Sequence, residues 1–374
     1  MSFDSPVPSA SDVCPPGSKY PLLPGVRSRF AQTARGRFHV YEGGTPGDEP
    51  VVLIHGNASS ARFFEDAVAA MPGYAVFAPD LRGYGASDAA VVDARRGMRD
   101  FADDIHALVE SLGIARFHLL GWSLGGNIAM QYALDHHERL RSLTLLAPGS
   151  PYGFGGTRGV NGVPNYPDFA GSGGGVISSA VSARYAAKDF SADSPFAPRS
   201  ALRNGILKPT FRLPPEREDA LVEQMLMMRI GDDYYPGDSV LSARWPYQAP
   251  GVYGANNALS PKYLNQSALG DLRGGPPILW MRGADDQIVS DTSLADPAYL
   301  GKLRMIPGWP GESVCPPQPM LAQTRAMLDR YRAGGGDYRE VVFADCGHAP
   351  PLEKRDAFLE HTLRFLRGAG ASGE

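Results

Sequence analysis

The stretch Gly121-Trp122-Ser123-Leu124-Gly125-Gly126 constrains the fold of this chain more than any other. It lies between an apolar run at residues 117–120 and an amphipathic segment that begins near Asn127. This pattern predicts a strand that turns sharply into a helix, with a serine at the apex. The turn crowds the backbone, so the positions two before and two after the serine must lack bulk. The serine hydroxyl would then project beyond the sheet, at the positive end of the following helix.

The rest of the chain alternates predicted strands with predicted helices. Apolar runs predict strands at residues 51–54, 74–78, 143–147, 277–281 and 338–343, and residues 37–42 predict an earlier one. Periodic apolar positions predict helices at residues 61–70, 98–112, 318–332 and 353–366. Strands that alternate with helices across short loops favour an α/β protein with a parallel sheet covered on both faces.

One long segment interrupts this alternation. Residues 149–175 are so rich in glycine that little regular structure is expected there, and residues 176–188 and 216–230 predict isolated helices. We therefore expect a core formed by residues 25–148 and 271–374, with a cap inserted at residues 149–270. Residues 1–24 are rich in proline and serine and predict an N-terminal arm.

Charge and cysteine content exclude several classes of protein. The net charge is −4 over 374 residues and the basic residues are scattered, which argues against a nucleic-acid or anionic-membrane surface. The N-terminus lacks a signal-peptide pattern and no run is long enough to span a bilayer, so we expect a cytoplasmic protein. Cys14, Cys315 and Cys346 show no metal-ligand spacing and fit reduced thiols, although a Cys14–Cys315 bridge stays open. No metal and no cofactor are expected.

An activated serine needs a base, and the base needs a carboxylate to orient it. His348 is the best base, because it lies in a Gly/Pro loop directly after the last predicted strand. The loop 283–289 offers two acids, Asp285 and Asp286, which strand position alone does not separate. The chain order serine, acid, histidine matches one fold and differs from the chymotrypsin and subtilisin orders.

The developing oxyanion requires two backbone N–H donors. One is the amide of Leu124, at the start of the predicted helix. The other should come from the loop 55–58 after an early strand, most simply from Asn57.

With these residues the chain resembles α/β-hydrolase fold enzymes. His55-Gly56-Asn57, the loop 80–87, the elbow at Ser123, the loop 283–289 and Gly347-His348 occur in that family's order and extend over nearly the whole chain outside the cap. The resemblance implies a mostly parallel, doubly wound sheet with an inserted cap. It also implies that Asp286 is the acid and Asp285 a solvated turn residue. The glycine-rich cap and the long segment between Asp286 and His348 depart from the family pattern.

The expected activity is hydrolysis of a small-molecule carboxylic ester or lactone through an acyl-enzyme. A carbon–carbon bond hydrolase, an amidase or peptidase and a cofactor-free perhydrolase use the same triad and stay open, as does a homodimer. A ligand-binding receptor on a hydrolase scaffold is the alternative of another class, and steady turnover of an aryl ester would exclude it. Ordinary cap packing competes with a pocket role for the aromatic residues that we assign to substrate binding: Trp122, Tyr152, Phe154, Trp245 and Trp309.

Overall fold

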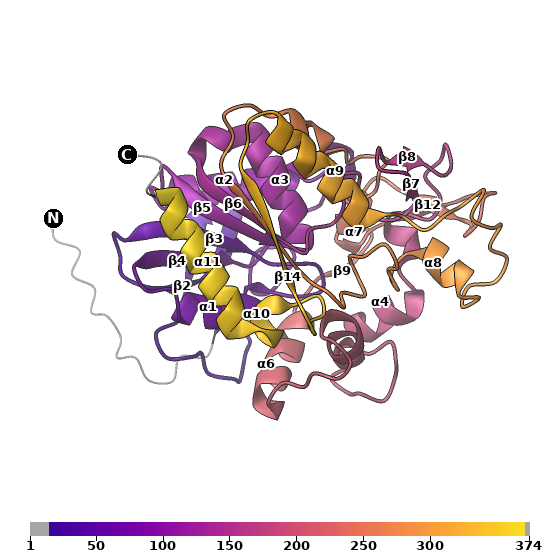
Figure 1. The fold of residues 1–374 in the computed structure, drawn as a ribbon. Coiled ribbons are helices and arrows are strands. Elements are labelled where there is room, and N and C mark those ends of the chain that lie inside the picture. Colours follow the sequence, from indigo (N-terminus) through magenta and orange to yellow (C-terminus); the bar gives the residue numbers. More distant parts are fainter. Residues whose placement is uncertain (1–14, 371–374) are drawn as a thin grey trace.

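A sheet of eight strands lies at the centre of the protein, with helices on both of its faces (Figure 1). The computed structural model describes residues 15–370. The two pairings at one edge, β1 with β2 and β2 with β4, are antiparallel, whereas the remaining pairings are parallel. The predicted α/β class with a mostly parallel, doubly wound sheet is therefore confirmed. In spatial order the strands are β1 (Arg27–Thr33), β2 (Gly36–Gly43), β4 (Tyr74–Pro79), β3 (Glu49–Ile54), β5 (Phe117–Trp122), β6 (Leu140–Leu146), β13 (Ile278–Gly283) and β14 (Tyr338–Phe343).

The central strands are apolar because helices cover them on both sides. Every residue of β5 is buried, and so are the last four residues of β3. Helices α2, α3 and α9 lie over one face and α1 and α11 over the other (Figure 1). These elements lie close to the predicted ranges. Their bounds are α1 (Glu65–Ala69), α2 (Arg99–Ser111), α3 (Leu124–His136), α9 (Met320–Ala333), α10 (Pro350–Glu353) and α11 (Arg355–Gly370).

Strand β1 was not among the predicted elements. Its sequence carries a single buried residue, Ala31, and its other side chains are exposed or half-buried. An edge strand pairs on one side only and needs no continuous apolar run. Its apolar pattern was therefore too weak to indicate a strand.

The chain leaves the sheet after β6 and returns to pair β13 directly with β6. None of the strands described between them joins the central sheet. The predicted helices at 176–188 and 216–230 are shorter than expected. The inserted elements are β7 (Thr157–Arg158), β8 (Val163–Pro164), α4 (Ser179–Ala186), α5 (Pro198–Ala201), α6 (Pro215–Met225), β9 (Ile230–Gly231), β10 (Tyr235–Pro236), β11 (Ser239–Leu241), β12 (Gln248–Pro250) and α7 (Ala255–Ala258); α8 (Pro297–Lys302) follows β13.

Residues 15–24 lie against the body of the protein without regular structure. The buried guanidinium of Arg62 donates hydrogen bonds to the carbonyl oxygens of Tyr20 and Pro21 at 3.1 and 2.6 Å. The other residues of the predicted arm, including Cys14, lie outside the described range. Cys315 and Cys346 are buried free thiols.

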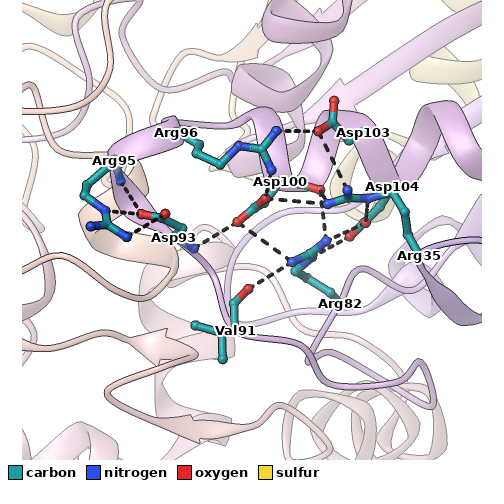
Figure 2. A network of polar contacts seen from close by, with 9 residues as sticks. All are labelled: Arg35, Arg82, Val91, Asp93, Arg95, Arg96, Asp100, Asp103 and Asp104. Carbon is teal, nitrogen blue, oxygen red and sulfur yellow. Dashed lines mark hydrogen bonds and ion pairs between the residues drawn. The ribbon is translucent and has the colours of Figure 1, made fainter.

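A cluster of arginine and aspartate side chains joins the loop after β4 to helix α2 (Figure 2). Arg82 donates two hydrogen bonds of 2.5 Å to Asp104, and a third of 2.9 Å to the carbonyl oxygen of Val91. Arg35 donates to the same carboxylate at 2.7 Å. Arg82 and Asp104 are both buried, so each charge depends on the other for compensation. The cluster fixes the loop that follows β4, and this loop reaches the candidate site.

Replacing Arg82 with methionine is expected to lower the free energy of unfolding by about 3–5 kcal/mol, because it leaves buried aspartates without their main cation. Urea denaturation followed by circular dichroism measures the change. Arg95→Met is the matched control. That side chain is 59% exposed and pairs with Asp93 at the surface, so its loss should leave the free energy of unfolding almost unchanged. Equal losses in the two variants would contradict a structural role for the buried pair.

Candidate active site

Ser123 stands at the turn between β5 and α3. Its backbone has φ 56° and ψ −119°, and this positive φ is one that residues other than glycine rarely adopt. A Cβ atom at Gly121 would lie 2.0 Å from the carbonyl oxygen of Gly125, and one at Gly125 would lie 2.2 Å from that of Ile54. Only glycine fits at either position. The predicted crowding is therefore real, and it holds the serine in a strained, projecting conformation.

His348 and Asp286 lie together, and His348 shares a cavity wall with Ser123. Nδ1 of His348 is 2.7 Å from Oδ2 of Asp286, and both side chains are buried. The other carboxylate oxygen, Oδ1, accepts hydrogen bonds from the backbone N–H groups of Ile288 and Val289 at 2.8 and 3.0 Å. Because an ionised carboxylate can only accept, Nδ1 carries the imidazole proton and Nε2 presents a lone pair.

The neighbouring Asp285 occupies a different place. It is half exposed, and its carboxylate pairs with Nζ of Lys208 at 2.7 Å. Of the two acids that strand position left unresolved, the fold brings Asp286 to the histidine and turns Asp285 to the surface.

Trp122 joins the histidine loop to the serine turn. Its Nε1–H donates a hydrogen bond of 2.8 Å to the carbonyl oxygen of His348, and the two rings are 5.5 Å apart. The N–H of His348 donates to the carbonyl oxygen of Ile206 at 2.9 Å. No hydrogen bond joins Ser123 to His348 in the described chain. Such bonds are commonly loose before substrate binds.

The two predicted oxyanion donors are free to bind a ligand. Leu124 is the first residue of α3, where an N–H has no partner within the helix. Within residues 15–370 neither its N–H nor that of Asn57 has a hydrogen-bond partner. The side chain of Asn57 is fixed on both sides: it accepts from the hydroxyl of Tyr84 at 2.5 Å and donates to Oδ1 of Asn256 at 2.6 Å.

His55 supports the same loop. Burial lowers the pKa of His55, which keeps the imidazole neutral. Its Nε2 accepts a hydrogen bond of 3.0 Å from the N–H of Leu81, and its Nδ1–H is directed to the carbonyl oxygen of Gly56 at 2.8 Å. The loop carrying Asn57 is thus held by the segment that the arginine–aspartate cluster anchors.

A cavity of about 460 Å³ opens beside these groups. Ser123, His348 and Asn57 lie in its wall, together with the predicted Trp122 and Phe154. The remaining wall is largely apolar and comes mainly from the insertion: Val176, Ile177, Val181, Ile206 and Leu259, with Ile288 and Leu294 from the segment after β13. Among the described residues that line the cavity, none is charged.

Three of the aromatic residues predicted to bind substrate lie elsewhere. Trp245 and Trp309 belong to a separate small core, where their indole N–H groups donate to the carbonyl oxygens of Pro307 and Cys315. Tyr152 is buried beside Gly162 and is not part of the cavity wall. The segment 305–310 packs through Ile306 into the same small core. Ordinary packing, the competing interpretation, applies to these residues.

A buried carboxylate close to the histidine loop was not predicted from the sequence. Glu353 accepts hydrogen bonds from the backbone N–H groups of Gly347 at 3.0 Å, Lys208 at 2.9 Å and Ala349 at 3.3 Å. Burial raises the pKa of the Glu353 carboxyl. This side chain joins the insertion to the histidine loop. Its position five residues after His348 was the only signal in the sequence.

In the part of the chain from 15 to 370, no three histidine, cysteine or acidic side chains are grouped so that they could hold a metal ion. Over the same residues, no helix combines the length and apolar character needed to cross a bilayer.

Comparison with known proteins places this geometry in context. Residues 49–173 match the family model described as alpha/beta hydrolase fold. Over 361 residues the chain is 25% identical to a 2-hydroxy-6-oxo-6-phenylhexa-2,4-dienoate hydrolase of Comamonas testosteroni, covering 92% of this chain and 98% of that protein. A protein of the same name from Burkholderia cepacia is 36% identical over 120 residues, or 30% of this chain and 40% of that protein. An esterase from Exiguobacterium antarcticum superposes with a TM-score of 0.57 at 20% identity, covering 91% of this chain and 100% of the esterase.

Proposed function

The chain belongs to the α/β-hydrolase fold superfamily, and on this basis we propose that it is a serine hydrolase that cleaves uncharged carboxylic esters or lactones. The observation that carries the proposal is the buried His348–Asp286 pair, whose histidine lines the same cavity as the strained Ser123. A histidine held by a carboxylate, in the same cavity as a serine, is the arrangement that activates a hydroxyl nucleophile.

In this proposal the hydroxyl of Ser123 attacks the carbonyl carbon of the substrate while Nε2 of His348 takes its proton. The negative charge that develops on the carbonyl oxygen is stabilised by the N–H groups of Asn57 and Leu124. His348 then gives the proton to the leaving alkoxide, and the acyl group stays on Ser123. A water molecule, deprotonated by the same imidazole, attacks the acyl-enzyme and releases the acid. Asp286 stabilises the imidazolium that forms in both halves of the reaction.

The composition of the cavity wall favours an uncharged substrate. A carboxylate that binds in an apolar site loses its hydrating water. Without a cation to compensate for this loss, binding costs several kcal/mol. An ester or a lactone brings no such charge, and its alkyl or aryl parts gain free energy from burial against the apolar wall.

A second candidate is hydrolysis of a carbon–carbon bond in a dienoate. It is favoured by the relative from Comamonas testosteroni, whose alignment extends over nearly the full length of both proteins. A dienoate carries a carboxylate, however, and no arginine or lysine from the described residues lines this cavity. We therefore rank the ester or lactone first.

A direct comparison of substrates tests this ranking. We expect kcat/KM for p-nitrophenyl butyrate to exceed that for 2-hydroxy-6-oxo-6-phenylhexa-2,4-dienoate by about 100-fold or more, the rate ratio that corresponds to a few kcal/mol. Both reactions are followed by absorbance, and turnover that persists in Ser123→Ala is subtracted as background. Faster cleavage of the dienoate would overturn the proposal in favour of the second candidate.

A further inference from the structure

Two tyrosines of the insertion face the cavity that holds Ser123. Tyr185 lies on α4 and Tyr235 on β10, and both belong to the cavity wall. Their ring centroids are 6.4 Å apart with an interplanar angle of 52°. Both side chains are otherwise buried, with 1% and 6% of their surfaces exposed. Their rings contribute to the apolar wall, and each brings one polar atom with it.

The hydroxyls of these tyrosines lack partners in the protein. Within residues 15–370 neither Tyr185 nor Tyr235 makes a hydrogen bond through its hydroxyl, and neither oxygen is sealed from the cavity. Buried tyrosine hydroxyls usually find a partner, because an unmade hydrogen bond costs free energy. Burial raises the pKa of both phenols, so each keeps its proton and can donate it. Two unused donors therefore face the space where substrate would bind.

The position of the pair relates it to the oxyanion loop. The pKa of Tyr84 is raised by burial and, in addition, by the proximity of Tyr235 and Tyr185. The hydroxyl of Tyr84 in turn donates a hydrogen bond to Oδ1 of Asn57. Tyr185 and Tyr235 also share the cavity wall with Asn57, so their hydroxyls face the space that a substrate bound to the oxyanion donors would occupy.

We propose that Tyr185 and Tyr235 are specificity residues that donate hydrogen bonds to a second, uncharged oxygen of the substrate. This inference rests on the proposed function. The preferred substrate is then an apolar ester or lactone that carries an additional carbonyl or ether oxygen. The second oxygen is uncharged because no described residue in the cavity wall could balance an anion.

Pairs of esters that differ by one oxygen test the proposal. On the acyl side, p-nitrophenyl 3-, 4- and 5-oxohexanoate are compared with the hexanoate, and on the alcohol side 4-acetylphenyl with 4-ethylphenyl hexanoate. In the unmodified protein at least one oxygenated ester should be favoured in kcat/KM on the order of 10-fold, the effect of one or two neutral hydrogen bonds. In Tyr185→Phe/Tyr235→Phe this ratio should fall toward one. Tyr247→Phe, an exposed position outside the cavity, should keep the full ratio.

Two further readouts separate this proposal from its alternatives. The double variant should unfold at the temperature of the parent, since no hydrogen bond within the protein is lost; a clear decrease in Tm would show a structural role and overturn the proposal.

Binding of the same esters to Ser123→Ala, followed by tryptophan fluorescence, measures selectivity without catalysis. Equal Kd values for all pairs would overturn the specificity role. A retained Kd ratio without ester hydrolysis by the parent protein would instead overturn the proposed function alone.

Discussion

Ser123→Ala is expected to lower kcat for an aryl ester by a factor on the order of 10⁶, since the nucleophile and its base act as one unit. The variant should fold normally. Alanine tolerates the left-handed backbone at position 123 about as well as serine does, and in the described chain the hydroxyl makes no hydrogen bond that would be lost. Steady-state hydrolysis of p-nitrophenyl butyrate measures the activity, and thermal unfolding monitors the fold.

Ser313→Ala is the matched control, because Ser313 is exposed and lies away from the cavity. Its activity should equal that of the parent protein. Activity of Ser123→Ala within about 10-fold of the parent would remove Ser123 from the mechanism. A single stoichiometric burst by the parent protein, without further turnover, would support the receptor alternative instead.

The candidate site could be predicted where local backbone geometry dictates the residue type. Gly121 is required because a Cβ atom there would lie 2.0 Å from the carbonyl oxygen of Gly125, within the turn itself. The apolar runs of β3 and β5 follow from burial on both faces of a parallel sheet. Each of these features can be predicted from a few consecutive residues. The turn at Ser123 and the loop of His348 could both be predicted for this reason, because each pattern consists of a few consecutive residues next to a strand.

The parts that could not be predicted depend on contacts between distant segments. Asn57 is oriented by Asn256, 199 residues later in the chain, and no pattern near either residue indicates the pairing. Trp245 and Trp309 have the composition of a substrate pocket, yet the insertion and the segment after β13 pack them into a core of their own. An aromatic residue is equally suited to both environments, so only the path of the chain between them decides.

The hydrogen bonds of the two adjacent acids distinguish them independently of the resemblance to a known family. Asp285 and Asp286 stand at the same strand end, but only Asp286 accepts two backbone N–H groups through one oxygen while it meets Nδ1 of His348 with the other. Those backbone hydrogen bonds hold the carboxylate in place beside the imidazole. Asp285 instead forms an exposed pair with Lys208.

Asp286→Asn is therefore expected to lower kcat by about 10⁴-fold, because an amide NH₂ facing Nδ1 favours the tautomer whose Nε2 carries a proton and cannot act as base. The asparagine oxygen can still accept the N–H groups of Ile288 and Val289, so the loop should keep its shape. Asp285→Asn changes charge and size in the same way at the adjacent position and should alter kcat by less than about 3-fold, since exposed ion pairs contribute little. Hydrolysis of p-nitrophenyl butyrate by the two variants gives the comparison. A larger loss in Asp285→Asn would show that the surface pair with Lys208, and not the buried pair with His348, supports the reaction.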